Sequence, residues 1–274
     1  AADTLLLAND TDVDHNSQLK VSGVVDSSSN NGALSYTSSS GRVVYNPVGK
    51  FDYLAEGDQE AATFTYSVAD EYGATHQAQV DVTITGVNDA PVANQDAVSV
   101  LQNGSSTFDP AENDTDVDLG DTRRVTSVSN PTANYGTAVL DPVTARVTYS
   151  TGSGFDYLAH NEQASETFSY TVQDRFNGTD QGNVVVTVTG VNDAPEAVDD
   201  VQYISEDSSK TFDPTLNDRD VDNGDVLHLA SAELDSGARG EIEILANGQI
   251  HYDSSNKFDE LPQGSSATES LTYS

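Results

Sequence analysis

The sequence contains no cysteine, methionine or tryptophan, and only 11 lysine and arginine residues against 45 aspartate and glutamate residues. Without cysteine, the chain forms no disulfide and carries out no thiolate chemistry. The formal net charge of −34 argues against a nucleic-acid partner, because phosphate binding requires a basic surface. No apolar run reaches the roughly 18 residues that a membrane-spanning helix needs, so we expect no direct membrane insertion.

No secretory signal peptide is visible, and the chain begins and ends within a repeated pattern. We therefore expect a fragment of a longer protein, whose export signal and anchor lie outside this sequence. So acidic a composition is typical of disorder. Regular runs of Val, Ile, Phe and Tyr interrupt the acidic residues, however, and predict folded structure.

Acidic hexamers recur at a fixed interval. NDTDVD occupies residues 9–14 and 113–118, and NDRDVD occupies residues 217–222, so the interval is 104 residues each time. Two further motifs keep this spacing, namely GVNDAP at residues 86 and 190 and FDYLA at residues 51 and 155. A period near one hundred suits a whole domain rather than a solenoid unit. We predict three tandem modules at residues 1–89, 90–193 and 194–274.

The outer modules are incomplete in this prediction. The first lacks its opening strand, because nothing precedes it to match the start of the second, and the third stops before its last strands. The third copy also departs from the FDYLA motif at Glu260 and Pro262. The sequence therefore does not predict which residues form the edge of its core there.

Within each module, alternating apolar and polar residues predict β-strands. Val80, Val82 and Ile84 alternate with polar neighbours, and residues 184–188 repeat this pattern one module later. Turn-forming residues, such as those at 27–32, separate the runs. About seven short strands per module predict an all-β, Ig-like antiparallel sandwich, with a barrel as the alternative.

The acidic hexamers place carboxylates at alternating positions, so that they can converge on one point where the backbone curls. An all-oxygen shell suits Ca²⁺ better than Mg²⁺, which demands a regular octahedron, or Zn²⁺, which prefers His and Cys. We expect Val13 to anchor the first loop to the core. The alternative is a solvated acidic turn without metal. The candidate ligands are Asp10, Asp12, Asp14, Asp114, Asp116, Asp118, Asp121, Asp218, Asp220, Asp222 and Asp225.

A second group of candidate ligands lies where modules join. Asn88 with Asp89, and Asn192 with Asp193, follow the last strand of a module, and the next Ala-Pro keeps the backbone extended. A cation bound here would contact two modules and fix their angle. Asp70 and Asp174, each just after a strand, are candidates from a neighbouring loop. The alternative for all six is a plain turn.

Several motifs in fixed order carry a family resemblance across nearly the whole chain. LANDTDVD, FDYLAEGD, TFTYSVAD and VTITGVNDAPVA resemble the VCBS and cadherin-like tandem repeats of large bacterial surface proteins, including RTX-type adhesins and biofilm proteins. The resemblance implies Ig-like or cadherin-like sandwiches, Ca²⁺ in loops and at junctions, and export to the bacterial cell surface. The positions that match the motifs are the acidic-loop aspartates and the Asn-Asp pairs at the junctions.

Three classes of function are weighed on these observations. The first is an extender, stiffened by Ca²⁺, that holds a distal binding domain of an adhesin away from the cell. The second is a module that itself binds a glycan or a surface protein. The third is an enzyme, which we do not expect because the carboxylates lie in open repeated loops, the five histidines do not recur in register and no nucleophile elbow is present. We favour the extender, with calcium ions and neighbouring modules as partners.

Overall fold

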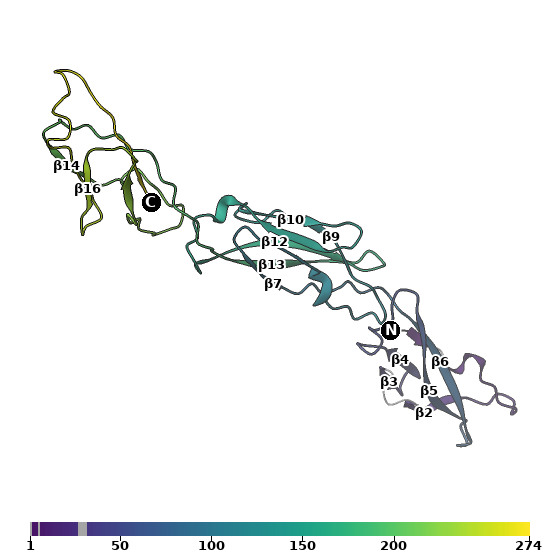
Figure 1. Ribbon diagram of the computed structural model, residues 1–274. Coiled ribbons are helices and arrows are strands. Elements are labelled where there is room, and N and C mark those ends of the chain that lie inside the picture. The colour runs from purple at the N-terminus through teal and green to yellow at the C-terminus, as the bar shows by residue number, and fades with distance from the viewer. Residues whose placement is uncertain (1, 5, 27–31) are drawn as a thin grey trace.

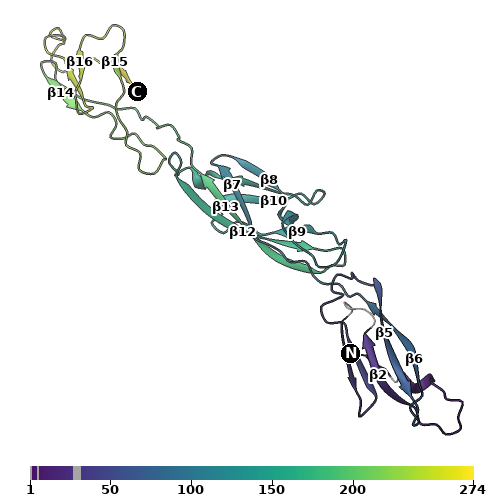
Figure 2. The same ribbon diagram turned by 90° about the horizontal axis from the view of Figure 1, so that it is seen from below.

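A computed structural model describes residues 2–4, 6–26 and 32–274 and shows three β-rich modules in a row along one axis (Figures 1 and 2). The turn expected at residues 27–32 lies almost wholly outside the described residues. Among those residues, no helix has the length and apolar character needed to span a bilayer.

The middle module is a seven-stranded sandwich. One sheet has the order β7-β13-β12-β9 and the other the order β10-β11-β8. Every pairing is antiparallel except that of β13 with β7, which is parallel. Two short 3₁₀ helices, η2 (Pro110–Glu112) and η3 (Ser153–Phe155), lie between strands. The strands are β7 (Asp96–Leu101), β8 (Ser105–Phe108), β9 (Arg124–Val128), β10 (Gly136–Leu140), β11 (Val147–Thr151), β12 (Gln163–Gln173) and β13 (Thr179–Thr189).

The first and third modules repeat parts of this plan. The first pairs its strands as β1-β4-β3 and β2-β5-β6, and the third as β14-β17-β16 and β15-β18. The strands of the first module are β1 (Ala2–Thr4), β2 (Lys20–Asp26), β3 (Ala33–Thr37), β4 (Arg42–Asn46), β5 (Gln59–Ala69) and β6 (Thr75–Thr85), with the 3₁₀ helix η1 (Leu6–Asn9). Those of the third are β14 (Ser209–Phe212), β15 (Ala232–Leu234), β16 (Glu241–Ile244), β17 (Ile250–Asp253) and β18 (Leu271–Tyr273).

The alternating residues fill the cores as the sequence predicts. In the middle module, Val184, Val186 and Val188 of β13 are fully buried and pack in one cluster with Phe168 and Tyr170 of β12. These residues face inward because successive side chains of a strand point to opposite faces. Fully burying each such side chain stabilises the fold by about 1.5–3 kcal/mol. The core lies between the sheets, so the polar loops are left at the two poles of each module.

The FDYLA and GVNDAP motifs meet at one pole. Phe155 and Leu158 are buried beneath the turn that follows η3. The N–H of Gly190 donates to the Glu162 carbonyl at 2.8 Å, and a Cβ on Gly190 would lie only 2.3 Å from the Ala159 carbonyl oxygen. Glycine is therefore needed at this position, because only a residue without a side chain allows so close a backbone approach.

The divergent third copy keeps its core anchor. Phe258 is buried, and the Arg239 guanidinium lies over its ring at 4.2 Å. Glu260, which departs from the FDYLA motif, forms an ion pair with Arg239. The departure thus adds a charged partner at the rim and leaves the aromatic anchor buried.

Candidate functional site

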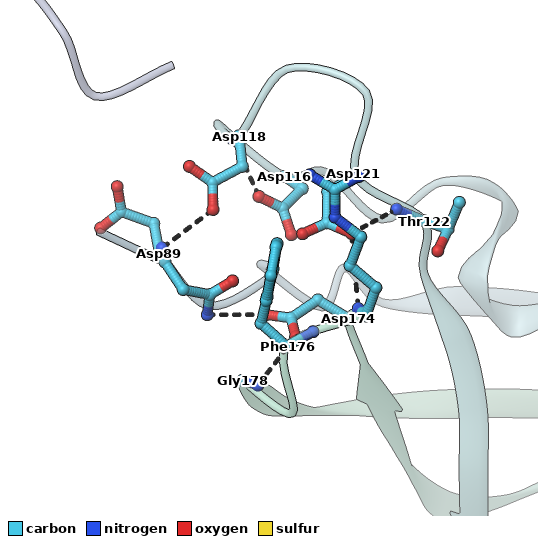
Figure 3. A network of polar contacts seen from close by, with 10 residues as sticks. Asp89, Asp116, Asp118, Asp121, Thr122, Asp174, Phe176 and Gly178 are labelled. Atoms are coloured by element: carbon cyan, nitrogen blue, oxygen red, sulfur yellow. Dashed lines mark hydrogen bonds and ion pairs between the residues drawn. The ribbon is translucent and has the colours of Figure 1, made fainter. Parts of the chain in front are cut away.

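The first candidate site lies where the linker after β6 meets the middle module (Figure 3). Asp174, at the end of β12, is 5% exposed. Its Oδ1 accepts hydrogen bonds from the N–H groups of Phe176 at 2.7 Å and Gly178 at 2.8 Å. The turn between β12 and β13 therefore fixes this carboxylate before any ligand binds.

The acidic loop brings further carboxylates to the same place. The N–H of Asp118 donates to Asp116 Oδ1 at 2.9 Å, which curls the backbone so that alternate side chains converge. One carboxylate oxygen from each of Asp116, Asp121 and Asp174 lies within 4.8 Å of the other two. The loop and the β12–β13 turn together form a cluster of negative charge at one pole (Figure 3).

The linker joins this cluster from the side of the first module. The N–H of Asp89 donates to Asp118 Oδ2 at 3.0 Å, and Asn88 Nδ2 donates to Asp174 Oδ2 at 3.0 Å. The N–H of Asn88 donates to Glu56 Oε2 at 3.0 Å. Glu56 belongs to the first module, so the junction is framed by acidic side chains of both modules.

A backbone hydrogen bond also crosses the junction. The N–H of Leu119, in the acidic loop, donates to the carbonyl oxygen of Tyr53 at 2.9 Å. Tyr53 lies in the FDYLA turn of the first module, so that turn contacts both its own linker and the next module.

The cluster holds more acceptor oxygens than the protein satisfies. Four buried oxygens have no hydrogen-bond partner, namely Asn88 Oδ1, Asp116 Oδ2, Asp118 Oδ1 and Asp121 Oδ2. Burial raises the pKa of the Asp118 carboxyl, as do the charges of Asp116, Asp89 and Asp121, against the lowering effect of the Asp89 N–H. Arg175 supplies one positive charge, 3.5 Å from Asp121. A hard cation fits this oxygen set, because it would use the unpaired oxygens and offset the repulsion.

The second junction repeats most of this geometry. The N–H of Asp193 donates to Asp222 Oδ2 at 2.9 Å, and the N–H of Asn223 donates to the Tyr157 carbonyl at 2.8 Å. Asp222 Oδ1 is buried without a partner. Asp220, Asp222 and Asp225 bring carboxylate oxygens within 4.8 Å of one another. The Asn192 amide instead donates to the Asp193 carbonyl, within its own linker.

The acidic loop of the first module lies at the pole away from the first junction, because Asp70 ends β5 there whereas residue 86 follows β6 at the other pole. Asp70 Oδ1 accepts from the N–H groups of Tyr72 at 2.9 Å and Ala74 at 2.8 Å, as Asp174 does in the middle module. Asp12 accepts from the N–H of Asp14 and from the Ser17 hydroxyl. In the described residues, these side chains do not form a close carboxylate cluster of the kind found at the two junctions.

The first aspartate of each hexamer contacts a tyrosine rather than the junction cluster. Asp10, Asp114 and Asp218 accept from the hydroxyls of Tyr66, Tyr170 and Tyr273 at distances of 2.7–3.0 Å. The expectation that Val13 anchors its loop is wrong. Val13 is 98% exposed, because the tyrosine–aspartate contact ties the loop to the sandwich instead.

Sequence reasoning missed Glu56 as a junction residue. It follows directly after FDYLA, but the same position of the next module carries His160, and a search for recurring residues therefore passes over it.

Comparison with known families gives one match that repeats along the chain. The bacterial cadherin-like domain family matches residues 1–86, 88–190 and 192–274. Among proteins of curated function, none matches this chain.

Comparison with solved structures gives matches to cadherins at low sequence identity. A structure of protocadherin gamma B7 extracellular cadherin domains 1–4 is 19% identical, with a TM-score of 0.48, covering 92% of this chain and 66% of that one. Drosophila N-cadherin EC1-4 is 14% identical, with a TM-score of 0.41 and coverages of 95% and 63%. Mouse cadherin-23 EC22-24 is 16% identical, with a TM-score of 0.37 and coverages of 63% and 52%. The chain thus spans less than two thirds of the length of these structures.

Proposed function

This chain belongs to the bacterial cadherin-like domain family, and we propose that it is an extender segment of a bacterial cell-surface adhesin that Ca²⁺ stiffens at the module junctions. Cadherin-like domains are extracellular structural and adhesion modules, and they are not enzymes. The observation that carries the proposal is the set of four buried, unpartnered oxygens at the first junction.

The proposed ligands at the first junction come from three segments. The acidic loop offers Asp116, Asp118 and Asp121, the β12–β13 turn offers Asp174, and the linker and first module offer Asn88, Asp89 and Glu56. The corresponding ligands at the second junction are Asn192, Asp193, Asp220, Asp222 and Asp225. A bound Ca²⁺ supplies positive charge among these oxygens and tolerates their irregular geometry.

The mechanism of stiffening follows from the position of these residues. Without the cation, crowded carboxylates on both sides of the junction repel, so the two modules are free to change their angle. With it, residues of the linker and of the next module bind one centre, and stability rises because only the folded junction binds. Asp12, Asp14 and Asp70 are proposed as the equivalent set at the opposite pole of the first module.

The resemblance to VCBS repeats and RTX-type adhesins supports the finer assignment. We propose module boundaries at residues 89/90 and 193/194, between which each sandwich is a separate spacer. Extracellular Ca²⁺ at millimolar concentration suits sites of this kind, whose affinities in extracellular modules are about 10⁻⁴–10⁻³ M. The other candidate is a module that binds a glycan or a surface protein, and a glycan array would separate the two.

Small-angle scattering with and without Ca²⁺ tests the extender. We expect Ca²⁺ to lengthen the particle and to raise the melting temperature by several degrees, because it binds the native junctions. Asp116→Ala with Asp118→Ala should remove binding at the first junction and leave the second. Asp81→Asn is the matched control, since Asp81 is an exposed carboxylate in the middle of β6. An unchanged particle length and melting temperature after chelation would rule out the mechanism.

A further inference from the structure

A second group of carboxylates lies within the middle module, apart from the junction cluster. Asp96 begins β7, Asp109 precedes η2, and Asp114 begins the acidic loop. Tyr170 of β12 joins them, since its hydroxyl lies 2.7 Å from Asp114 Oδ1. Asp96 lies near this pair, since the charges of Asp114 and Asp109 both raise the pKa of its carboxyl.

This group has fewer hydrogen-bond donors than acceptor oxygens. The Tyr170 hydroxyl carries one proton, yet Asp114 Oδ1 and the Asn94 carbonyl, at 2.8 Å, both compete for it. Asp114 is 3% exposed, and its Oδ2 has no hydrogen-bond partner. Asp96 Oδ2 is buried without a partner as well. Unpaired buried carboxylate oxygens are costly, so this arrangement calls for a positive charge between them.

In the part of the chain that the structure describes, no lysine or arginine forms an ion pair with this group. The ion pairs of Arg175 with Asp121, Arg219 with Glu196, Arg239 with Glu260 and Lys257 with Glu241 all lie elsewhere. Burial raises the pKa of Asp96 to about 6, and the charge of Asp114 adds to the effect. The Asp109 carboxylate caps η2 with Oδ1, at 3.0 Å from the Ala111 nitrogen, which leaves Oδ2 for another partner.

The same group recurs in the third module, at the same spacing. Asp200, Asp213 and Asp218 replace Asp96, Asp109 and Asp114, each 104 residues later. The Tyr273 hydroxyl lies 3.0 Å from Asp218 Oδ1 and 3.4 Å from Asp200 Oδ2. Burial raises the pKa of Asp200, and the charges of Asp218 and Asp213 contribute to the shift. All three aspartates and the tyrosine of this group therefore recur in the third module.

The first module carries only part of this group. Tyr66 donates to Asp10, but position 5 carries leucine where the later modules have Asp109 and Asp213. The hydroxyl–aspartate contact is thus common to all three modules. The carboxylate of Asp109 has an equivalent in the third module, Asp213, and leucine takes its place in the first.

We propose that Asp96, Asp109 and Asp114 bind a calcium ion inside the middle module, and that Asp200, Asp213 and Asp218 bind another in the third. The Asn94 carbonyl and the Tyr170 hydroxyl complete an all-oxygen set of the kind that Ca²⁺ accepts. The site is separate from the junction, because none of its carboxylates is among the proposed junction ligands and none of its ligands comes from the neighbouring module. Its role is to tie β7 to the start of the acidic loop, which positions Asp116 and Asp118 for the junction.

Terbium luminescence tests the inner sites, since Tb³⁺ occupies oxygen-rich calcium sites and tyrosine sensitises its emission. The chain has no tryptophan, so only tyrosines act as donors. We expect Ca²⁺-displaceable emission from the full chain. Asp96→Asn with Asp200→Asn should lower that emission several-fold and should reduce the Ca²⁺ count in equilibrium dialysis by one ion for each substitution. Asp81→Asn should change neither quantity.

Two further measurements keep the test decisive. Asp116→Asn with Asp121→Asn should remove junction ligands and keep the inner ions. The inner-site proposal can therefore be tested even if the junction proposal fails. The melting curve shows whether Asp96→Asn with Asp200→Asn folds, which we expect because the substitutions relieve repulsion. An unchanged ion count in that folded variant would overturn the proposal. That result is expected if a proton shared by Asp96 and Asp114, rather than a calcium ion, offsets their repulsion.

Discussion

At the scale of single residues, tyrosine hydroxyls bonded to carboxylates recur throughout the chain. Tyr149 donates to Glu166, which is 3% exposed, and Tyr252 donates to Glu269 at 2.8 Å. A buried carboxylate needs donors to offset its desolvation, and a phenol provides one while its ring fills the core. The acidic composition is therefore accommodated inside the sandwiches as well as at their poles.

The Tyr252–Glu269 pair predicts a dependence of stability on alkaline pH. Burial, followed by the hydrogen bond to Glu269, raises the pKa of Tyr252 from 10.0 to about 12. The folded state holds this proton more tightly, so the contribution to stability is complete below pH 10 and is lost as the pH rises to 12.

Denaturant unfolding of Tyr252→Phe and of the parent chain measures this contribution. We expect the variant to lose about 1–3 kcal/mol near neutral pH, and the difference to shrink between about pH 10 and 12. Tyr72→Phe is the control, because Tyr72 is 86% exposed. A difference that stays constant over this range would contradict the assignment.

At the scale of elements, the turn after η3 and the end of β13 act as one unit. The N–H of Asn161 donates to the Gly190 carbonyl at 3.1 Å, and that of Gly190 donates to Glu162 at 2.8 Å. The equivalent bonds at Gly86 join residues 57 and 58. This unit carries the linker, so its packing sets where the junction residues begin.

Gly190→Ala should therefore destabilise the middle module. The added Cβ would lie 2.3 Å from the Ala159 carbonyl oxygen and 2.4 Å from that of Leu158, and backbone atoms cannot easily give way. We expect a loss of about 1–3 kcal/mol in the free energy of unfolding. Gly23→Ala is the control, since no atom lies within 4 Å of its added Cβ. Equal melting temperatures for the two variants would refute the close-approach argument.

The strands could be predicted from sequence because their signal is local. Alternation at residues 80–84 and 184–188 reports which face is buried, whatever the rest of the chain does. The junction partners of the aspartates could not be found in this way. Glu56 and Asp174 are 118 residues apart (174 − 56), and both bond to Asn88 only because two sandwiches meet at the linker. Asp114 and Asp116 look equivalent in sequence, but the Tyr170 hydroxyl draws Asp114 to a different site.

At the scale of the whole molecule, the two junctions are similar in backbone and unequal in charge. In both, an N–H of the acidic loop donates to a backbone carbonyl in the FDYLA turn of the preceding module. The donor is Leu119 at the first junction, at 2.9 Å, and Asn223 at the second, at 2.8 Å. The first junction has Glu56, whose carboxylate accepts from the Asn88 N–H at 3.0 Å. The second has His160 at the matching position. Since the number of charged ligands sets Ca²⁺ affinity, the first should bind more tightly.

A reciprocal exchange tests this inequality and the transmission of stiffness along the rod. Glu56→His should weaken Ca²⁺ binding at the first junction by roughly tenfold, and His160→Glu should strengthen it at the second by a similar factor, about 1.4 kcal/mol each. Each junction is compared with itself, so other differences between them cancel. Because the chain has no cysteine, pairs of introduced cysteines can carry spin labels on adjacent modules. During a Ca²⁺ titration, the label-to-label distance distribution should narrow at lower concentration across the first junction than across the second. The double exchange should raise the Ca²⁺ concentration at which the first junction narrows and lower it at the second, and unchanged midpoints at both junctions would show that Glu56 does not contribute to the stiffening.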